Sequence, residues 1–219
     1  MTAVVIMGAG AHAREILEIL RQPANAKLEV VGFIDDNPSL HGKRIDDAVV
    51  LGDWSWFAGV DRREVGVICG SGLSKTRKQM VEKALSLGLK FVNAISPFAR
   101  ISPSAKVGEG VVMYANSIVS RGSFIDDHVA INVGAIIGHD TRVDAYGTLN
   151  PGVNLAGNVR IGEGCLLGIG CSVIQGMTIG AWSTIGAGAV VVRDLPDNVT
   201  AVGVPARIIE TREGGGDHL

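Results

Sequence analysis

The residue types best suited to chemistry lie together in the segment Gly138-His139-Asp140. A neutral imidazole accepts a proton from an attacking nucleophile, and a neighbouring carboxylate fixes its tautomer and raises its basicity. The pair therefore predicts a general base, His139, supported by Asp140. A solvated surface histidine is the alternative for any single His.

A second candidate site follows the first apolar run, residues 3–7. The segment Gly8-Ala9-Gly10-Ala11-His12-Ala13 fits the Gly-x-Gly-x-x-Ala turn, which lets a phosphate approach a helix N-terminus. Asp35 and Asp36 end the next apolar run, where a carboxylate can accept hydrogen bonds from a ribose or a base. Capping of a turn formed with Asn37-Pro38 is the other interpretation of the two carboxylates.

The three cysteines, Cys69, Cys165 and Cys171, are too few and too odd in number for a disulfide framework. The sequence contains no Cys-x-x-Cys or His-rich metal spacing. We therefore expect reduced core cysteines and no metal site.

Composition excludes several classes of function. Hydrophobic residues make up 47% of the 219 residues and charged residues 19%, which suits a packed fold. The net charge of −2 provides no basic field for nucleic acid or an anionic membrane. The sequence has no apolar run of the roughly 18 residues that a membrane span needs and no signal-peptide pattern, so we expect a cytoplasmic protein.

The first part of the chain, up to about residue 91, alternates short apolar strands with helical stretches. This alternation predicts a small Rossmann-like parallel α/β domain over residues 1–94. The expected strands are residues 3–7, 29–34, 65–69 and 90–92, and the expected helices are residues 11–21 and 74–87.

From Ile95 to Val191 the pattern changes to a period of six. Every sixth residue is aliphatic, 17 in succession, which matches neither a helix nor an amphipathic strand but does match a parallel β-solenoid. Small or apolar residues recur four places later, among them Cys165 and Cys171, so both cysteines are expected to point inward. The expected solenoid covers residues 95–207, followed by a C-terminal tail over 208–219. The 17 positions are Ile95, Ile101, Val107, Met113, Val119, Ile125, Ile131, Ile137, Val143, Leu149, Leu155, Ile161, Leu167, Val173, Ile179, Ile185 and Val191.

Taken together, several motifs resemble one family along nearly the whole chain. They are the glycine turn at residues 8–13, Gly138-His139-Asp140, Pro151-Gly152, residues 156–159, Gly168-Ile169-Gly170 and residues 202–207. The chain looks like a bacterial hexapeptide-repeat sugar acetyltransferase, a family that includes N-acetyltransferases of nucleotide-linked 4-amino-4-deoxy sugars and sialic acid O-acetyltransferases. The resemblance implies a left-handed β-helix with three hexapeptides per coil, acetyl-CoA as co-substrate and a homotrimer.

The resemblance also implies roles for single residues. His139 matches the general base and Asp140 its acidic neighbour. The matches to nucleotide-sugar contacts are Gly10, Ala11, His12, Asp35 and Asp36, and those to acetyl-CoA contacts are Thr148, Ile169, Ala187 and Arg207. Thr148 stands where several relatives carry a second His, which leaves the oxyanion donor open between a hydroxyl and a backbone N–H.

The function implied is N-acetylation of a UDP- or GDP-linked 4-amino sugar, such as GDP-perosamine, by direct attack. O-acetylation of a sugar hydroxyl, as in the sialic acid enzymes, is the alternative. Two more distant alternatives are a nicotinamide-dependent oxidoreductase that uses the glycine turn and a non-catalytic scaffold built on the repeats. The α/β part is only about half of a full dinucleotide domain, which argues against the oxidoreductase.

Overall fold

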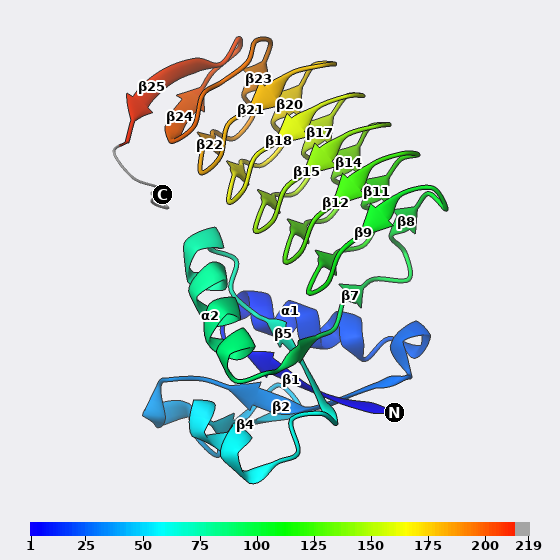
Figure 1. Cartoon of the computed structure of the whole chain (residues 1–219), viewed down its shortest axis with the longest axis vertical. Coiled ribbons are helices and arrows are strands. Elements are labelled where there is room, and N and C mark those ends of the chain that lie inside the picture. The colour runs from blue at the N-terminus through cyan, green and yellow to red at the C-terminus, as the bar shows by residue number, and fades with distance from the viewer. Residues whose placement is uncertain (213–219) are drawn as a thin grey trace. The chain divides into compact units, whose positions relative to one another are not determined.

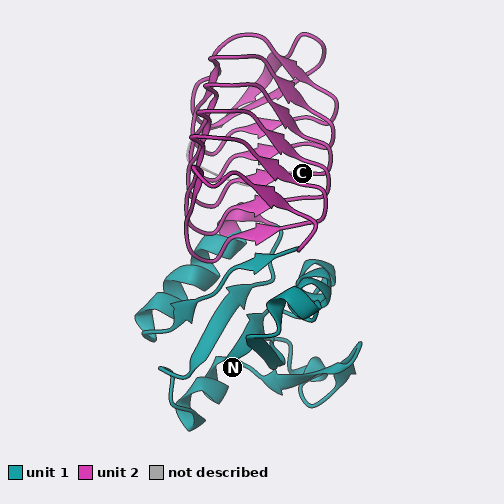
Figure 2. Cartoon of the chain, turned by 90° about the vertical axis from the view of Figure 1, so that its right-hand side faces the viewer, with its two compact units in different colours: residues 1–72, 76–96 teal, residues 73–75, 97–219 magenta. Residues whose placement is uncertain are grey.

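A computed structural model describes residues 1–212, which form two compact units (Figure 2). The first unit contains residues 1–72 and 76–96, and the second contains residues 73–75 and the chain from residue 97 onward. The last part of the expected tail, residues 213–219, lies outside the described residues.

The first unit is an α/β domain whose central strands are parallel. Its sheet has the order β3-β4-β2-β1-β5-β6, and only β3 runs antiparallel to its neighbour. Its strands are β1 (Thr2–Met7), β2 (Leu28–Ile34), β3 (Arg44–Ile45), β4 (Ala48–Gly52), β5 (Val65–Cys69), β6 (Lys90–Phe91) and β7 (Ala94–Ile95). Its helices are α1 (Ala11–Leu20) and α2 (Ser74–Ser86), with short 3-10 helices at Pro23–Asn25, Pro38–Leu40 and Trp54–Gly59.

The alternation of strands and helices predicted for this part is confirmed. β1 pairs with both β2 and β5, so the ends of β1, β2 and β5 lie together at one edge of the sheet. Helix α1 buries Ala13, Ile16 and Leu17 on one face, as its apolar spacing requires. The β3–β4 hairpin was not predicted: β3 is only two residues long, and β4, which pairs in parallel with β2, follows it without an intervening helix.

The second unit is a β-helix built mostly of two-residue strands, as the period of six predicted, and it is left-handed, as the family resemblance implied. Figure 1 shows its successive coils stacked one on another along the axis of the β-helix. The strands are β8 (Arg100–Ile101), β9 (Lys106–Val107), β10 (Val112–Met113), β11 (Ile118–Val119), β12 (Phe124–Ile125), β13 (Ala130–Ile131), β14 (Ile136–Ile137), β15 (Arg142–Val143), β16 (Thr148–Leu149), β17 (Asn154–Leu155), β18 (Arg160–Ile161), β19 (Leu166–Leu167), β20 (Ser172–Val173), β21 (Thr178–Ile179), β22 (Thr184–Ile185), β23 (Val190–Val191), β24 (Val199–Val202) and β25 (Arg207–Thr211).

Three parallel sheets form the three faces of this helix. One sheet has the order β23-β20-β17-β14-β11-β8, the second β21-β18-β15-β12-β9, and the third contains β24, β22, β19, β16, β13 and β10. Each strand pairs with the strand one coil later, for example Ile137 with Leu155 and Leu149 with Leu167. Aliphatic side chains therefore stack on aliphatic side chains along the lumen.

The lumen is the core of the second unit. Every sixth-residue aliphatic side chain from Met113 to Val191 is at most 3% exposed, whereas Ile101 and Val107, at the first coil, are only half-buried, as is Ile95 in the first unit. Cys165 and Cys171 are fully buried, which confirms that they point inward. Burial raises the pKa of each of these two thiols to about 12, so neither is available as a thiolate nucleophile.

The corners between the faces repeat a left-handed backbone conformation. It recurs at every sixth residue from Gly110, with φ 66°, to Gly188, with φ 67°. Glycine takes this conformation without strain, and Asn and Asp do so at small cost. Asp140, with φ 56°, occupies one of these corners.

The β-helix ends in an antiparallel pair. β25 pairs with β24, and Arg212 donates a hydrogen bond to the carbonyl oxygen of Trp182. Residues 208–212, which we expected to belong to the tail, are therefore ordered against the last coil. Pairing of backbone groups with β24 explains the extension, since the sequence after residue 207 lacks the hexapeptide period.

Glycines that follow the lumen residues mark places where two coils come close. A Cβ atom at Gly162 would lie 2.6 Å from the backbone nitrogen of Ala181, and one at Gly168 would lie 2.5 Å from that of Ala187. These contacts are with backbone of the next coil, which cannot move aside alone. We expect Gly162→Ala to lower the free energy of unfolding by about 3 kcal/mol, the cost of forcing atoms into packed structure.

The matched control for this substitution is Gly59→Ala, because a Cβ atom there has nothing within 4 Å. Chemical denaturation of both variants measures the difference. Equal stabilities would contradict the close coil contact at Gly162.

Candidate functional site

The His139–Asp140 pair lies on a corner of the β-helix, directly after β14. The lumen residues on either side, Ile137 and Thr141, are buried, whereas the side chains of His139 and Asp140 are 50% and 41% exposed. The imidazole is therefore outside the packed lumen. This arrangement leaves it accessible to a substrate.

Hydrogen bonding orients the imidazole. Nδ1 of His139 lies 2.9 Å from Oδ2 of Asp140, and the same carboxylate oxygen is 3.5 Å from Nη1 of Arg121. In the tautomer whose Nδ1–H donates to Asp140, Nε2 carries the lone pair. The geometry thus provides a proton acceptor at Nε2 and a carboxylate that stabilises the imidazolium after proton uptake.

The glycine turn and Asp35 and Asp36 meet at one cavity of the first unit. This cavity has a volume of about 290 Å³ and lies at the carboxyl ends of β1, β2 and β5. Helix α1 begins at Ala11, with Gly10 as its N-cap, so its first N–H groups are at the same edge. The cavity is lined by Gly8, Ala9, Gly10, Ile34, Asp35, Asp36, Trp54, Gly70, Ser71, Thr76 and Met80.

The two carboxylates in this cavity differ in their bonding. Asp35 accepts one hydrogen bond from the backbone N–H of Ala9 and another from that of Asn37, each at 2.9 Å. The bond to Ala9 connects the glycine turn to the end of β2. The bond to Asn37 caps the turn at Asn37-Pro38, which was the other interpretation of the two carboxylates. Asp36 is exposed beside it, and its carboxylate is the more available of the two for a ligand.

Sequence reasoning missed Trp54 as a lining residue. Its ring lies 4.6 Å from Nζ of Lys83, in a cation–π contact, and the 3-10 helix that carries it is capped by Asp53. The Asp53-Trp54-Ser55 sequence signals a capped turn, but nothing local places that turn at the cavity. Only the sheet order brings the segment after β4 close to the end of β2.

His12 does not line the cavity. Burial, and secondarily the positive charge of Arg77, lower the pKa of His12 from its usual 6.5 to about 4. The imidazole is therefore neutral at physiological pH. The sequence predicted the position of His12 in α1 but not the partial burial of its imidazole.

The residues expected to contact acetyl-CoA occupy different parts of the second unit. Ile169 and Ala187 are exposed and lie one coil apart on one corner, whereas His139 lies on another corner. Thr148 is only 5% exposed, and its hydroxyl oxygen lies 3.2 Å from that of Ser74. Arg207 begins β25 and is exposed. Within one chain, these residues do not gather around His139.

The sequence shows no recognisable partner for His41, His128 or His218, but the structure gives the first two a partner. Nε2 of His41 lies 2.8 Å from the carbonyl oxygen of Asp35. The ring of His128 is buried and stacks on that of Tyr146, with centroids 5.4 Å apart. Asp35 lies six residues before His41 and Tyr146 lies one coil after His128, and nothing in the sequence around either histidine marks these contacts. His218 lies outside the described residues.

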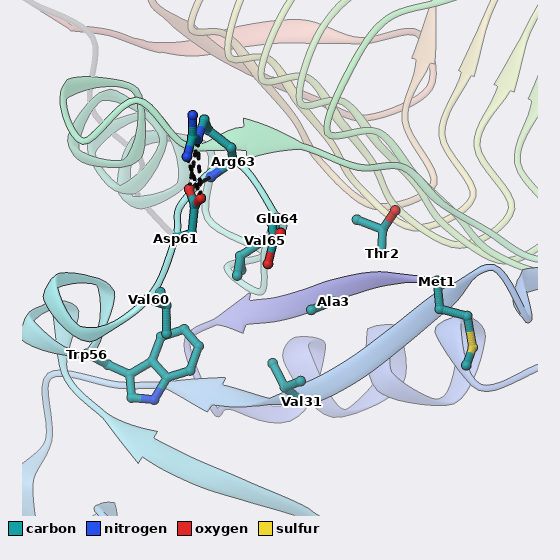
Figure 3. A pocket seen from close by; sticks show the side chains of 10 residues that line it. All are labelled: Met1, Thr2, Ala3, Val31, Trp56, Val60, Asp61, Arg63, Glu64 and Val65. Atoms are coloured by element: carbon teal, nitrogen blue, oxygen red, sulfur yellow. Dashed lines mark hydrogen bonds and ion pairs between the residues drawn. The ribbon is translucent and has the colours of Figure 1, made fainter.

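A larger hollow of the first unit, of about 770 Å³, lies at the opposite ends of the strands (Figure 3). It is bordered by the first residues of β1, by Val31 and by Trp56, and an ion pair between Asp61 and Arg63 lies at its rim. It contains none of the expected site residues. Within residues 1–212, we find no group of three or more His, Cys, Asp or Glu placed to hold a metal ion.

Comparisons with known proteins cover both units. The sequence profile of the PglD N-terminal domain matches residues 3–84, and no curated protein sequence matched the chain. A mutant perosamine N-acetyltransferase from Caulobacter crescentus, solved with CoA and GDP-perosamine, is 38% identical, with a TM-score of 0.89, over 96% of this chain and 98% of that chain. The chain belongs to the hexapeptide-repeat sugar acetyltransferase family.

Two further members of this family show the same fold. The acetyltransferase domain of PglB from Neisseria gonorrhoeae FA1090 is 33% identical, with a TM-score of 0.89, over 95% of this chain and 100% of that chain. WeeI from Acinetobacter baumannii AYE is 25% identical, with a TM-score of 0.87, over the same shares. Within residues 1–212, none of the helices of this sugar acetyltransferase is long and apolar enough to cross a membrane.

The low pKa of His12 makes stability depend on pH. The unfolded chain binds a proton near pH 6.5 and the folded chain only near pH 4, so this contribution is complete above pH 6.5 and declines as the pH falls toward 4. Between pH 7.5 and pH 5 we expect it to remove about 2 kcal/mol from the free energy of unfolding. Urea denaturation of wild type and His12→Gln at both pH values measures it. If the free energy of unfolding changed equally with pH in wild type and in His12→Gln, a neutral, half-buried His12 would be contradicted.

Proposed function

We propose that the chain is an acetyl-CoA-dependent N-acetyltransferase that acts on a nucleotide-linked 4-amino-4-deoxy sugar. The observation that carries the proposal is the exposed His139–Asp140 pair, with Nδ1 bonded to the carboxylate and Nε2 left as an acceptor. It occurs in a chain that is 39% identical to a Caulobacter crescentus protein solved with CoA and GDP-perosamine. PglB from Neisseria gonorrhoeae, solved with acetyl coenzyme A, supports the co-substrate.

The proposed reaction is a direct attack of the sugar amine on the thioester. The amine nitrogen forms a bond to the acetyl carbonyl carbon, and Nε2 of His139 takes the proton that the nitrogen loses. The tetrahedral intermediate then collapses by breaking the carbon–sulfur bond. The proton on His139 neutralises the departing CoA thiolate, so the imidazole returns to its starting state and the products are the acetamido sugar and CoA.

An acyl-enzyme intermediate is not part of this mechanism. Cys165 and Cys171 lie in the lumen, and burial raises the pKa of both to about 12. Cys69 is buried at the end of β5, and burial raises the pKa of its thiol as well. These thiols are therefore poor nucleophiles, and the amine must attack the thioester itself.

Thr148 is a poor oxyanion donor in this setting. Its hydroxyl is buried beside that of Ser74, both in the second unit. Of the two donors that the sequence left open, a hydroxyl and a backbone N–H, we therefore favour a backbone N–H. We assign CoA contacts to backbone groups at Ile169 and Ala187 and a phosphate contact to Arg207.

We assign the nucleotide portion of the acceptor to the first-unit cavity. Gly10 and Ala11 place the N-terminus of α1 at a phosphate, and the exposed carboxylate of Asp36 accepts hydrogen bonds from a base or ribose. Asp35 holds the turn in place. His12 contributes a neutral imidazole behind Ala11 rather than a charge. Both UDP- and GDP-linked sugars remain candidates, and GDP-perosamine is the ligand of the Caulobacter relative.

We also propose a homotrimer in which two copies share each site. His139 and the pair Ile169 and Ala187 lie on different corners of one chain, so a second copy is needed to bring both sets together. The face that contains β14, with the corners before and after it, exposes apolar side chains that a second copy would cover. These side chains are Val133, Ile136, Ile169, Ile174 and Val192. Free cysteines and acetyl-CoA both suit the cytoplasm, where we expect the enzyme to act.

The base function of His139 is tested by substitution. We expect His139→Ala and His139→Asn to lower kcat by about 10²- to 10⁴-fold, because a positioned base is lost, while KM values change little. Release of CoA thiol with GDP-perosamine and a UDP-linked 4-amino sugar measures the rate. A folded His139→Ala variant with nearly normal kcat would refute this role.

The same assay separates the alternatives. Acetylation of a sugar without an amine would indicate an O-acetyltransferase. Failure with every amino sugar and hydroxyl acceptor would favour a scaffold.

The proposed assembly is tested by sedimentation equilibrium. We expect a mass three times the chain's 22.8 kDa, and we expect Ile136→Glu to dissociate it, because burying a carboxylate in an apolar contact is costly. Lys106→Glu, on a different face, is the control. An active monomer at assay concentration would contradict the shared site.

A further inference from the structure

The His139 ring rests on a glycine of the next coil. A Cβ atom at Gly157 would lie 2.4 Å from Nε2 of His139, 2.5 Å from Cε1 and 2.9 Å from Cδ2. All three of its nearest neighbours are therefore atoms of one imidazole. The space that a side chain would occupy at Gly157 is filled by the His139 ring, and Gly157 is buried beneath it.

A second glycine lies beside the other member of the pair. A Cβ atom at Gly122, one coil earlier, would lie 2.2 Å from Oδ1 of Asp140. The imidazole and the carboxylate are thus each in contact with a glycine, on opposite sides along the β-helix axis. A side chain at either glycine would displace one partner of the 2.9 Å bond between Nδ1 and Oδ2.

The direction of the His139 contact distinguishes it from other corner contacts. His128 covers Gly110, Asp140 covers Gly122 and Trp182 covers Gly164, and in each of these pairs the side chain lies over the preceding coil. His139 instead lies over the following coil. His128, Asp140 and Trp182 have left-handed φ values, whereas His139 stands one place before such a residue, and its ring fills the space at Gly157.

Backbone conformation does not require glycine at position 157. The glycines with left-handed φ values include Gly122 and Gly152 but not Gly157. The three atoms nearest to a Cβ atom at Gly157 belong to a side chain, in contrast to Gly138, where the nearest atom is the carbonyl carbon of Ala156 at 2.5 Å. The closest contacts of a side chain at Gly157 would therefore be with His139.

We propose that Gly157 is a positioning residue for the reaction: its missing side chain makes the seat in which the His139 imidazole keeps Nδ1 on Asp140 and Nε2 toward the substrate. This inference rests on the proposed function of His139. A methyl group at position 157 tilts the ring away. A displacement of about 1 Å is enough to lower the rate of proton transfer by as much as 10²-fold.

The test is Gly157→Ala. We expect kcat for acetyl transfer to fall by about 10- to 100-fold, with KM for acetyl-CoA and for the nucleotide sugar within about 3-fold, because the substrate contacts are retained. Gly59→Ala is the matched control, since a Cβ atom there meets nothing within 4 Å. An unchanged kcat in a folded Gly157→Ala variant would overturn the proposal. A loss of kcat/KM that came entirely from a rise in KM would overturn it as well.

A double substitution separates the ring contact from a loss of structure. In the His139→Ala background the imidazole is gone, so adding Gly157→Ala should cause no further loss of activity or of melting temperature. If Gly157→Ala alone does not fold, the double variant should fold. A double variant that is also unfolded would show that position 157 excludes a side chain for another reason.

A ligand-free measurement keeps this inference distinct from the proposed function. In proton–carbon NMR spectra, the Cε1–H signal that disappears in His139→Ala should shift in Gly157→Ala and stay in place in Gly59→Ala. If wild type acetylates no sugar but this signal shifts, the proposed function fails while the contact between Gly157 and the His139 ring is supported. If the enzyme is active and the signal does not move, Gly157 does not position the His139 ring.

Discussion

Burial of one aliphatic side chain at every sixth residue is the constraint on which the second unit depends. It holds successive coils at the spacing of paired parallel strands and stacks like side chain on like, as Ile137 does on Leu155. With the lumen filled by aliphatic groups and by the small side chains four places later, a corner side chain such as those of His128 and His139 lies outside the lumen, either packed on a neighbouring coil or exposed. The exposed position of His139 is a direct result.

The close spacing of the coils also determines how that surface is shaped. Where neighbouring backbones approach each other, as at Gly138 and Gly162, a side chain would overlap the next coil. Where a corner side chain lies over a neighbouring coil, a glycine beneath it makes room. His139 and Asp140 use both neighbours, with Gly157 after them and Gly122 before them, so a hydrogen-bonded pair is held on a rigid scaffold rather than on a mobile loop.

In the first unit, two adjacent carboxylates at the end of β2 have different roles. The carboxylate of Asp35 accepts hydrogen bonds from the backbone N–H groups of Ala9 and Asn37, which fixes the glycine turn against the end of β2. That leaves Asp36 and the N-terminus of α1 facing the cavity. Two adjacent residues of one type therefore have different tasks, one holding the site together and the other available to a ligand.

The sequence by itself determined the period of six, the strand and helix alternation, the inward cysteines and the exposed His139–Asp140 pair, because each of these follows from spacing along the chain. Only the tertiary structure decided the neighbours across coils and across the sheet. It placed Gly157 under the His139 imidazole, Trp54 at the cavity and Tyr146 against His128, and it partly buried the ring of His12. Local patterns encode which face a side chain takes. Which distant residue it then meets depends on strand order and register, and these are set by the packing of the whole unit.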